Sequence, residues 1–207
     1  MVDIPIRDRR AERREATRAE ILDAAWAQVR SEGLTALSLR DLAAAVGMRP
    51  PSLYSYFESK NAIYDAMFAQ AAQQFLDDQV FTERPLSGDP LADLQAGMRS
   101  FARFCTDDPA RYQLLFQRTI PGFEPSPESF ALSVQALERT AQRLAEIGIA
   151  DPADIDLLTA LGTGLTDQQM SNDPGGDRWL RLVDDAMAMY FHHVSGRRAA
   201  PAGRGRQ

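Results

Sequence analysis

Residues 38–60 read SLRDLAAAVGMRPPSLYSYFESK. In the first half, Leu39, Leu42 and Val46 stand at i, i+3 and i+7, which is the spacing of one face of an α-helix. A helix this short is stable only when its apolar face packs on a neighbour. The first half therefore predicts a helix over 38–46 and a second apolar face close to it.

A tight turn and another helix follow. Gly47 falls where the first helix must stop, and positive φ at such a place costs little only for glycine. The Pro-Pro pair at 50–51 suits the first turn of a helix, which we expect over 50–57. Leu53 and Phe57 are four residues apart and can hold that helix inward. Helix, glycine turn and helix together have the outline of a helix-turn-helix.

The same register turns Ser52, Tyr54, Ser55 and Tyr56 toward the outer faces of the second helix. Tyrosine hydroxyls can donate to phosphate oxygens while their rings pack against sugars. Lys60, at the start of the next predicted helix, adds an ammonium group beside backbone N–H groups. This pattern favours contact with a nucleic-acid backbone. The alternative is that the tyrosines cover a small three-helix core and that the lysine is a solvated cap.

The order of these residues resembles the signature of the TetR family of bacterial regulators over about residues 15–68. The matching residues are Gly33-Leu34, Ser38-Leu39-Arg40-Asp41-Leu42-Ala43, Val46-Gly47 and Ser52-Leu53-Tyr54-Ser55-Tyr56-Phe57-Glu58-Ser59-Lys60. A leucine and tyrosine followed by a phenylalanine and a lysine, after a glycine turn, discriminate better than a bare helical hairpin. Leu39, where a polar residue is frequent, and Pro50 before Pro51 depart from the family pattern.

The resemblance implies a transcription regulator that binds double-stranded DNA at a palindromic operator, commonly as a repressor. Base reading falls to the N-terminal residues of the second helix, as in other recognition helices. Carried over position by position, Arg40 and Arg49 approach base edges or phosphates, Pro51, Ser52 and Ser55 line the groove, and Tyr54, Tyr56 and Lys60 hold phosphates.

The beginning of the chain is rich in arginine, with Arg7, Arg9, Arg10, Arg13, Arg14 and Arg18. These residues could form an arm that reaches the adjacent minor groove or the DNA backbone. Acidic residues lie between them, and this favours the other interpretation, a solvated helix face.

Net charge does not by itself support a nucleic-acid partner, because the chain carries −6 and such proteins commonly have a basic surface. The charge is unevenly distributed. Residues 1–60 hold ten Lys and Arg against nine Asp and Glu, and residues 61–207 hold thirteen against twenty. The acidity belongs to the second part, so the DNA contact must rest on individual residues.

Apolar residues recur with a helical period almost throughout the chain, and the breaks are short and rich in Pro, Gly, Asp and Ser. We expect an all-α fold of about nine helices, over 9–31, 38–46, 50–57, 60–82, 90–106, 109–119, 127–148, 153–171 and 177–195. The predicted N-caps are Ser38, Ser59, Asp89, Asp108 and Asp151. The predicted domains are a helix-turn-helix domain at 1–60 with a flexible arm at 1–14, a helical effector-binding and dimerisation domain at 61–195, and a disordered tail at 196–207.

Large, soft or aromatic side chains gather where such regulators enclose their effector: Met98, Phe101, Phe104, Cys105, Tyr112, Leu115, Phe116 and Met170. These residue types suit a plastic apolar pocket and favour a small apolar or aromatic effector as a partner. An ordinary core is the alternative for each of them. Arg99, Arg103 and Gln169 could supply polar contacts. The segment Tyr112-Gln113-Leu114-Leu115-Phe116, followed by Ile120 through Glu128, resembles one C-terminal subgroup of the family.

The last helix is apolar on most sides. One stripe is Leu180, Val183, Met187, Phe191 and Val194, and the rest of the surface carries Trp179, Leu182, Ala186, Met189 and Tyr190. Such a helix needs two packing partners. Gly162 and Gly164 in the preceding helix permit close helix contact. We expect a homodimer through the last two helices, as the resemblance also implies, with a buried central helix of a monomer as the alternative.

Two other function classes stay open. Cys105, His192 and His193 include nucleophile and base types, but adjacent histidines do not share a helix face, and no Gly-rich phosphate loop or H-E-x-x-H signature appears. We therefore expect no enzyme, no cofactor and no metal site. The second alternative is a DNA-binding regulator that needs no ligand.

The single cysteine excludes an internal disulfide, and no apolar run approaches the ~20 residues of a membrane span. We therefore expect a cytoplasmic protein.

Overall fold

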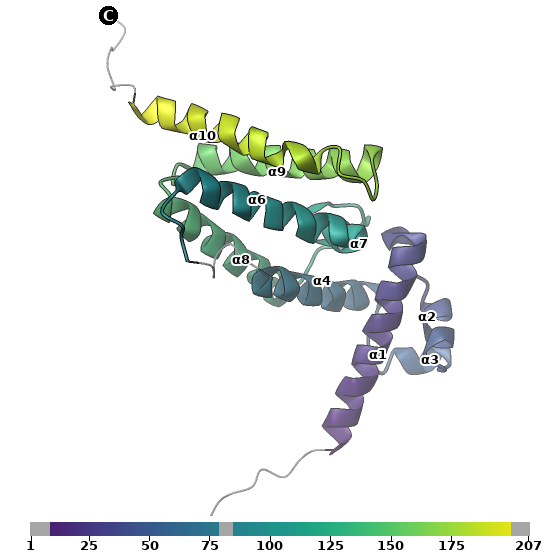
Figure 1. The fold of residues 1–207 in the computed structure, drawn as a ribbon. Coiled ribbons are helices and arrows are strands. Elements are labelled where there is room, and N and C mark those ends of the chain that lie inside the picture. Colours follow the sequence, from purple (N-terminus) through teal and green to yellow (C-terminus); the bar gives the residue numbers. More distant parts are fainter. Residues whose placement is uncertain (1–8, 79–84, 200–207) are drawn as a thin grey trace, which may run out of the picture. The chain divides into compact units, whose positions relative to one another are not determined.

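The structure, a computed structural model, describes residues 9–78 and 85–199. These residues contain nine α-helices and no strands, which confirms the predicted all-α fold (Figure 1). In chain order the helices are α1 (Arg9–Glu32), α2 (Leu39–Ala45), α3 (Pro50–Leu53), α4 (Lys60–Asp77), α6 (Pro90–Asp107), α7 (Pro109–Phe116), α8 (Pro127–Glu146), α9 (Pro152–Asn172) and α10 (Val183–Ala199), with 3-10 helices at Leu34–Ala36 and Leu180–Leu182. Within this described part, no helix is long and apolar enough to cross a membrane.

The predicted N-cap residues hold the starts of the helices. Asp89 accepts hydrogen bonds from the backbone N–H groups two and three residues further on, at 3.0 and 3.2 Å. Asp151 and Asp108 accept comparable bonds at 2.9 and 3.2 Å. The hydroxyl oxygens of Ser38 and Ser59 each accept from the N–H three residues on, at 3.3 and 3.0 Å. Satisfying these N–H groups fixes where each helix begins.

The second helix of the helix-turn-helix is shorter than the predicted 50–57, because regular α-helix ends at Leu53. The chain keeps turning after that residue. The N–H groups of Tyr56 and Phe57 both donate to the carbonyl oxygen of Leu53, at 3.0 Å each. Such shared bonds tighten the last turn of a helix. The turn before it forms as expected, with Gly47 at φ 67°.

The last helix also differs from its prediction, because α10 begins at Val183 and the predicted helix begins at 177. The cause is the buried side chain of Gln169. Its Oε1 accepts from the backbone N–H groups of Trp179 and Leu180, at 2.8 and 3.3 Å. These bonds hold the backbone before α10 as a turn. At its other end α10 continues to Ala199, past the predicted end at 195. The sequence predictions for residues 1–8, 79–84 and 200–207 lie outside the described residues.

The chain divides into two compact units. In its described part, the first consists of residues 9–72 and 113–130, and the second of residues 73–78, 85–112 and 131–199. The first unit therefore takes up the end of α7, the connection to α8 and the start of α8, together with α1 to α3 and most of α4.

The core of the first unit joins an apolar face of α1 to the inward residues predicted for the helix-turn-helix. Ile21, Leu22, Ala25 and Val29 of α1 are buried, as are Leu42, Leu53 and Phe57. Tyr64 of α4 is also buried, and its hydroxyl donates to the carbonyl oxygen of Leu34 at 2.5 Å. Burial raises the pKa of the Tyr64 phenol, so the group stays a donor.

The segment before α8 is fastened to the first turns of α4. The Asp65 carboxylate accepts from the N–H and the hydroxyl of Ser126 at 2.6 and 3.0 Å, and from the hydroxyl of Ser129 at 3.0 Å. The rings of Tyr64 and Phe123 lie 5.6 Å apart. A half-buried carboxylate is stabilised by several donors, so these contacts hold the chain at Phe123 and Ser126 against α4.

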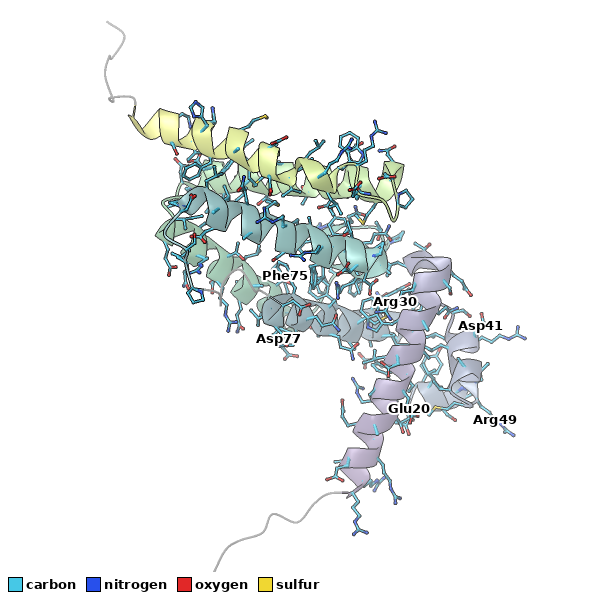
Figure 2. All side chains as sticks on the ribbon, viewed as in Figure 1. Glu20, Arg30, Asp41, Arg49, Phe75 and Asp77 are labelled. Carbon is cyan, nitrogen blue, oxygen red and sulfur yellow. The ribbon has the colours of Figure 1, made fainter. Side chains whose placement is uncertain are left out.

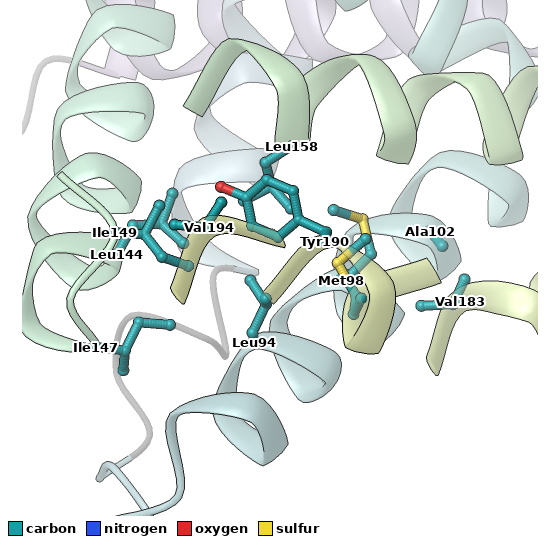
Figure 3. Close-up of a cluster of buried hydrophobic side chains, with 11 residues drawn as sticks. Leu94, Met98, Ala102, Leu144, Ile147, Ile149, Leu158, Val183, Tyr190 and Val194 are labelled. Atoms are coloured by element: carbon teal, nitrogen blue, oxygen red, sulfur yellow. The ribbon is translucent and has the colours of Figure 1, made fainter. Parts of the chain in front are cut away.

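In the second unit, α6, α9 and α10 pack against one another (Figure 1). The buried cluster of this unit, to which α8 and the segment after it also contribute, is shown in Figure 3 and consists of Leu94, Met98, Ala102, Leu144, Ile147, Ile149, Leu158, Val183, Met187, Tyr190 and Val194. Gly162 of α9 faces this cluster, because a Cβ there would lie 2.7 Å from the sulfur of Met98. Gly164 has open space and is exposed. Of the two glycines, Gly162 therefore serves packing within the chain.

Candidate nucleic-acid interface

The residues predicted to face DNA lie on the outside of α2, α3 and the turn that follows. Arg40, Arg49, Pro51, Ser52 and Ser55 are exposed. The Arg49 side chain extends outward from the start of α3 in Figure 2. Between them, the inward residues of the same segment are buried in the core of the first unit. The structure thus gathers these five residues on the solvent side of one short segment.

The two predicted phosphate-binding tyrosines differ in exposure. Tyr54 is 54% exposed, so its hydroxyl can reach a phosphate. Tyr56 is half-buried, and its ring centroid lies 5.2 Å from the guanidinium carbon of Arg14. Tyr54 therefore fits the predicted role more directly than Tyr56.

The Ser55 hydroxyl is already used as a donor. It donates to the carbonyl oxygen of Ser52 at 2.7 Å. A phosphate oxygen only accepts, so in this rotamer Ser55 has a lone pair and not a proton to offer. Ser55 can line the groove as predicted, but a hydrogen bond from it to phosphate requires the hydroxyl to rotate.

Lys60 opens α4 and is half-buried. Its ammonium donates to the carbonyl oxygen of Thr35 at 3.4 Å and lies 5.5 Å from the Tyr64 ring centroid. The Ala62 N–H beside it is capped by Ser59. The charge therefore sits at a helix N-terminus, next to backbone donors, where an anion is favoured.

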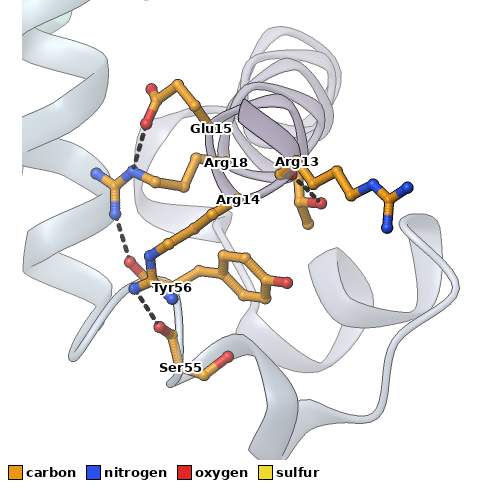
Figure 4. A network of polar contacts seen from close by, with 7 residues as sticks. Arg13, Arg14, Glu15, Arg18, Ser55 and Tyr56 are labelled. Carbon is orange, nitrogen blue, oxygen red and sulfur yellow. Dashed lines mark hydrogen bonds and ion pairs between the residues drawn. The ribbon is translucent and has the colours of Figure 1, made fainter. Parts of the chain in front are cut away.

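Two arginines of α1 reach residues 39–57, which comprise α2, α3 and the turn that follows and are called the recognition segment below. The sequence analysis assigned this contact to neither arginine. Arg14 donates from Nη2 to the carbonyl oxygen of Ser55 at 2.6 Å, and Arg18 donates from Nη1 to that of Tyr56 at 2.5 Å (Figure 4). The DNA arm stays a prediction, and Arg14 is exposed as on a solvated face, but neither interpretation included these contacts. The sequence feature that could have indicated this contact is the spacing of four residues between the two arginines, which puts both on one face of α1.

The predicted ligand-binding residues are divided between the two units. Leu115 and Phe116 belong to the first, and the others to the second: Met98, Phe101, Phe104, Cys105, Tyr112 and Met170. Phe75 brings two of these together, because its ring centroid lies 6.3 Å from that of Phe101 and 5.0 Å from that of Phe104. Met98 belongs to the buried cluster, and Met170 is half-buried on α9.

Polar groups stand beside these aromatic rings. The Tyr112 hydroxyl donates to Asp167 at 2.9 Å. Arg111, which sequence reasoning did not single out, has its guanidinium carbon 3.8 Å from the Phe104 ring centroid and donates to the Phe104 carbonyl oxygen at 2.5 Å. Cys105 is fully buried, and this burial raises the pKa of its thiol.

The three residues predicted to supply polar contacts to an effector have other surroundings. Arg99 pairs with Asp184, Gln169 holds the turn before α10, and Arg103 is exposed.

The last helices leave apolar side chains uncovered. Leu157 of α9, Leu182 of the 3-10 helix before α10, and Met189 of α10 are 41%, 38% and 70% exposed. The opposite stripe of α10, which includes Val183 and Met187, is buried in the cluster of the second unit. Within one chain, the apolar residues on one side of α10 are therefore buried, and Met189 on the other side is exposed to solvent.

Comparison with known proteins points to one family. Residues 21–67 match the family described as "Bacterial regulatory proteins, tetR family". An HTH-type transcriptional regulator of Mycobacterium tuberculosis is 26% identical over 124 residues, which are 59% of this chain and 53% of the relative. The chain thus spans about half the length of the curated relatives it matches.

Solved structures share the fold. A TetR family transcription regulator from Marinobacter aquaeolei superposes with a TM-score of 0.62 at 20% identity, over 87% of this chain and 96% of that chain. A TetR variant from Acinetobacter baumannii, solved in complex with minocycline, has a TM-score of 0.59 at 18% identity, over 88% of this chain and 98% of that chain.

Proposed function

We propose that this chain, whose residues 21–67 belong to the tetR family of bacterial regulatory proteins, is a DNA-binding transcriptional regulator that represses from a palindromic operator. One observation carries the proposal: basic, hydroxyl and tyrosine side chains are exposed on the recognition segment, and its apolar side chains are buried. In this proposal, residues 1–60 bind DNA in the cytoplasm, and residues 61–195 bind the effector and dimerise.

The proposed DNA contacts follow from side-chain chemistry. Arg40 and Arg49 are exposed and can bind base edges or phosphates. Tyr54 and Lys60 bind phosphates, with Tyr56 in a lesser role because of its burial. Pro51, Ser52 and Ser55 line the major groove. The two copies in a dimer would need to stand about one DNA turn apart, roughly 34–36 Å, to enter successive major grooves.

We propose that the dimer forms through α9 and α10. The uncovered Leu157, Leu182 and Met189 support this surface, because large apolar side chains in water are stabilised by burial against a partner. Gly164 on the same outer side of α9 would allow close approach of a second helix.

We further propose a small apolar or aromatic effector in the second unit, near Phe101, Phe104 and Tyr112. The ring contacts through Phe75 support an aromatic binding environment. Binding there would release DNA if the effector prefers the state in which the two DNA-binding segments are wrongly spaced. The A. baumannii protein was solved with minocycline bound, and this supports the proposal of an effector for this chain.

The surroundings of the cysteine and of the two histidines do not favour an enzyme. Cys105 has no exposed surface, and its raised pKa keeps the thiol protonated, whereas a cysteine nucleophile acts as the thiolate. His192 and His193 are exposed on α10 and lie next to each other in the chain. We therefore propose that the chain has no catalytic role.

Selection of bound duplexes from a random DNA pool with the purified chain tests the proposal. We expect a palindromic consensus whose half-sites lie about one turn apart. No enrichment over several rounds would contradict a sequence-specific regulator, and a single half-site would contradict the dimer.

The phosphate role of Lys60 has its own test on the selected duplex. Lys60→Ala should weaken binding to selected and scrambled duplexes alike and reduce the slope of log affinity against log salt by about 0.9. Arg139→Ala, which removes an exposed charge from α8, is the matched control. An unchanged slope for Lys60→Ala would remove this residue from the interface.

A further inference from the structure

The recognition helix is too short to hold itself in place. Its regular part is the single turn Pro50–Leu53. An isolated helix of this length is unstable. Recognition nevertheless needs side chains held to within about 0.5 Å of the productive geometry. Groups outside α3 must therefore fix its C-terminal end.

Arg14 and Arg18 supply these groups. Their guanidinium groups donate to two consecutive carbonyl oxygens, those of Ser55 and Tyr56, just after α3. Figure 4 shows both side chains reaching from α1 to this turn, whereas Arg13 points away from it. Hydrogen bonds from a charged donor are about twice as strong as neutral ones.

Ring contacts strengthen the same arrangement. The guanidinium carbon of Arg18 lies 4.3 Å from the ring centroid of Phe57, and that of Arg14 lies 5.2 Å from the ring centroid of Tyr56. Arginine can stack on a ring and donate in its plane at the same time, and lysine cannot. Each arginine therefore holds a backbone carbonyl and an aromatic side chain of the recognition segment together.

The surroundings of Arg18 also disfavour direct contact with DNA. Its Nε lies 3.8 Å from a carboxylate oxygen of Glu15, and its side chain is only 31% exposed. A phosphate approaching this arginine would meet that carboxylate.

We propose that Arg14 and Arg18 are positioning residues that fix the end of the recognition helix and thereby determine how well the chain discriminates its operator from other DNA. The proposal rests on the proposed function, because it assumes that this segment reads DNA. It assigns these two arginines to shape within the protein and not to the neutralisation of phosphates.

The first test needs no DNA. Amide hydrogen exchange is measured by NMR for Ser55, Tyr56 and Phe57, whose N–H groups bond to Ser52 and Leu53 oxygens. Arg14→Lys and Arg18→Lys should accelerate exchange at these amides by about 10-fold relative to the buried amides of α1. Arg13→Lys is the matched control and should change nothing. Unchanged exchange in the first two variants would overturn the proposal.

The second test compares two duplexes, the selected operator and a scrambled duplex of equal length. Arg14→Lys and Arg18→Lys should each lower the ratio of specific to non-specific affinity by about 10-fold and leave the salt slope unchanged. A phosphate ligand behaves differently, because lysine keeps the charge and so preserves affinity and slope.

Two results of the second test would overturn the proposal. One is full activity of the lysine variants together with a slope reduced by about 0.9 in Arg14→Ala or Arg18→Ala. The other is an equal loss on both duplexes with a lowered melting temperature, which would indicate a general effect on folding. If the random pool yields no operator, the proposed function fails, and hydrogen exchange alone decides whether the arginines fix the turn.

Discussion

Tyr54 and Tyr64 place the same hydroxyl in opposite surroundings, one in solvent and one donating to the buried carbonyl of Leu34. Tyr64→Phe leaves that carbonyl without its donor, so the free energy of unfolding should fall by about 1–3 kcal/mol. Urea denaturation followed by circular dichroism measures it. Tyr54→Phe should leave the urea midpoint unchanged and weaken DNA binding. Equal midpoints for the two variants would contradict the structural role of Tyr64.

Burial of a residue could be predicted from the sequence where its neighbours in the chain decide it. Leu53 and Phe57 are buried as their spacing predicted, because four residues bring side chains to one helix face. The contact between Arg14 and Ser55 spans 41 residues, and its existence depends on how α1 crosses the turn after α3. Spacing indicated the face of α1 but gave no information about what that face would meet.

At the scale of an element, the stability of a helix depends on the residue that caps its first turn. Asp151→Ala should lower the free energy of unfolding by about 1 kcal/mol, because the Ala153 N–H loses the carboxylate that caps it at 2.9 Å. Asp156→Ala, an exposed position further along α9, is the matched control and should stay within about 0.5 kcal/mol of the parent. Chemical denaturation of the two variants side by side measures the difference.

The turn before α10 should respond to acid. The backbone N–H of Arg178 and the side chain of Gln169, both bonded to Asp173, lower the pKa of that carboxyl. A lowered folded pKa gives stability that is present above the ordinary value near 3.8 and is lost as pH falls through the folded value. In a Trp26→Phe background, the fluorescence of Trp179 should report this step below about pH 4. Asp173→Asn should abolish it, and a step that persists in this variant would assign the transition to another group.

Element boundaries were predictable where a cap lies next to the helix it starts, as at Asp89 and Asp108. The start of α10 was not, because Gln169 acts on it from the end of α9. Its amide is a long-range substitute for a local cap. Periodicity describes which face of a helix is apolar, but a side chain from another element can still decide where the helix begins.

At the scale of the whole molecule, the uncovered apolar surface of α9 and α10 is the proposed dimer interface. Leu157→Lys with Met189→Lys places two charges on the uncovered surface of α9 and α10, and should convert the proposed dimer to monomer because burying an unpaired charge is costly. Sedimentation velocity measures the mass. Leu137→Lys alters a side chain on α8 that is 59% exposed, and should leave the dimer intact. A dimer that survives the first pair and dissociates with Leu137→Lys would move the interface to α8.

The contacts of Phe123 and Ser126 with Tyr64 and Asp65 have a consequence for biosynthesis. The first unit is discontinuous, so the ribosome makes α1 to α4 and then all of α6 before Phe123 and Ser126 emerge. A nascent chain that ends before residue 113 contains the complete recognition segment but lacks residues 113–130 of the first unit. N-terminal segments commonly fold first during synthesis, but here the first unit acquires its last partners only after the whole of α6 has been made.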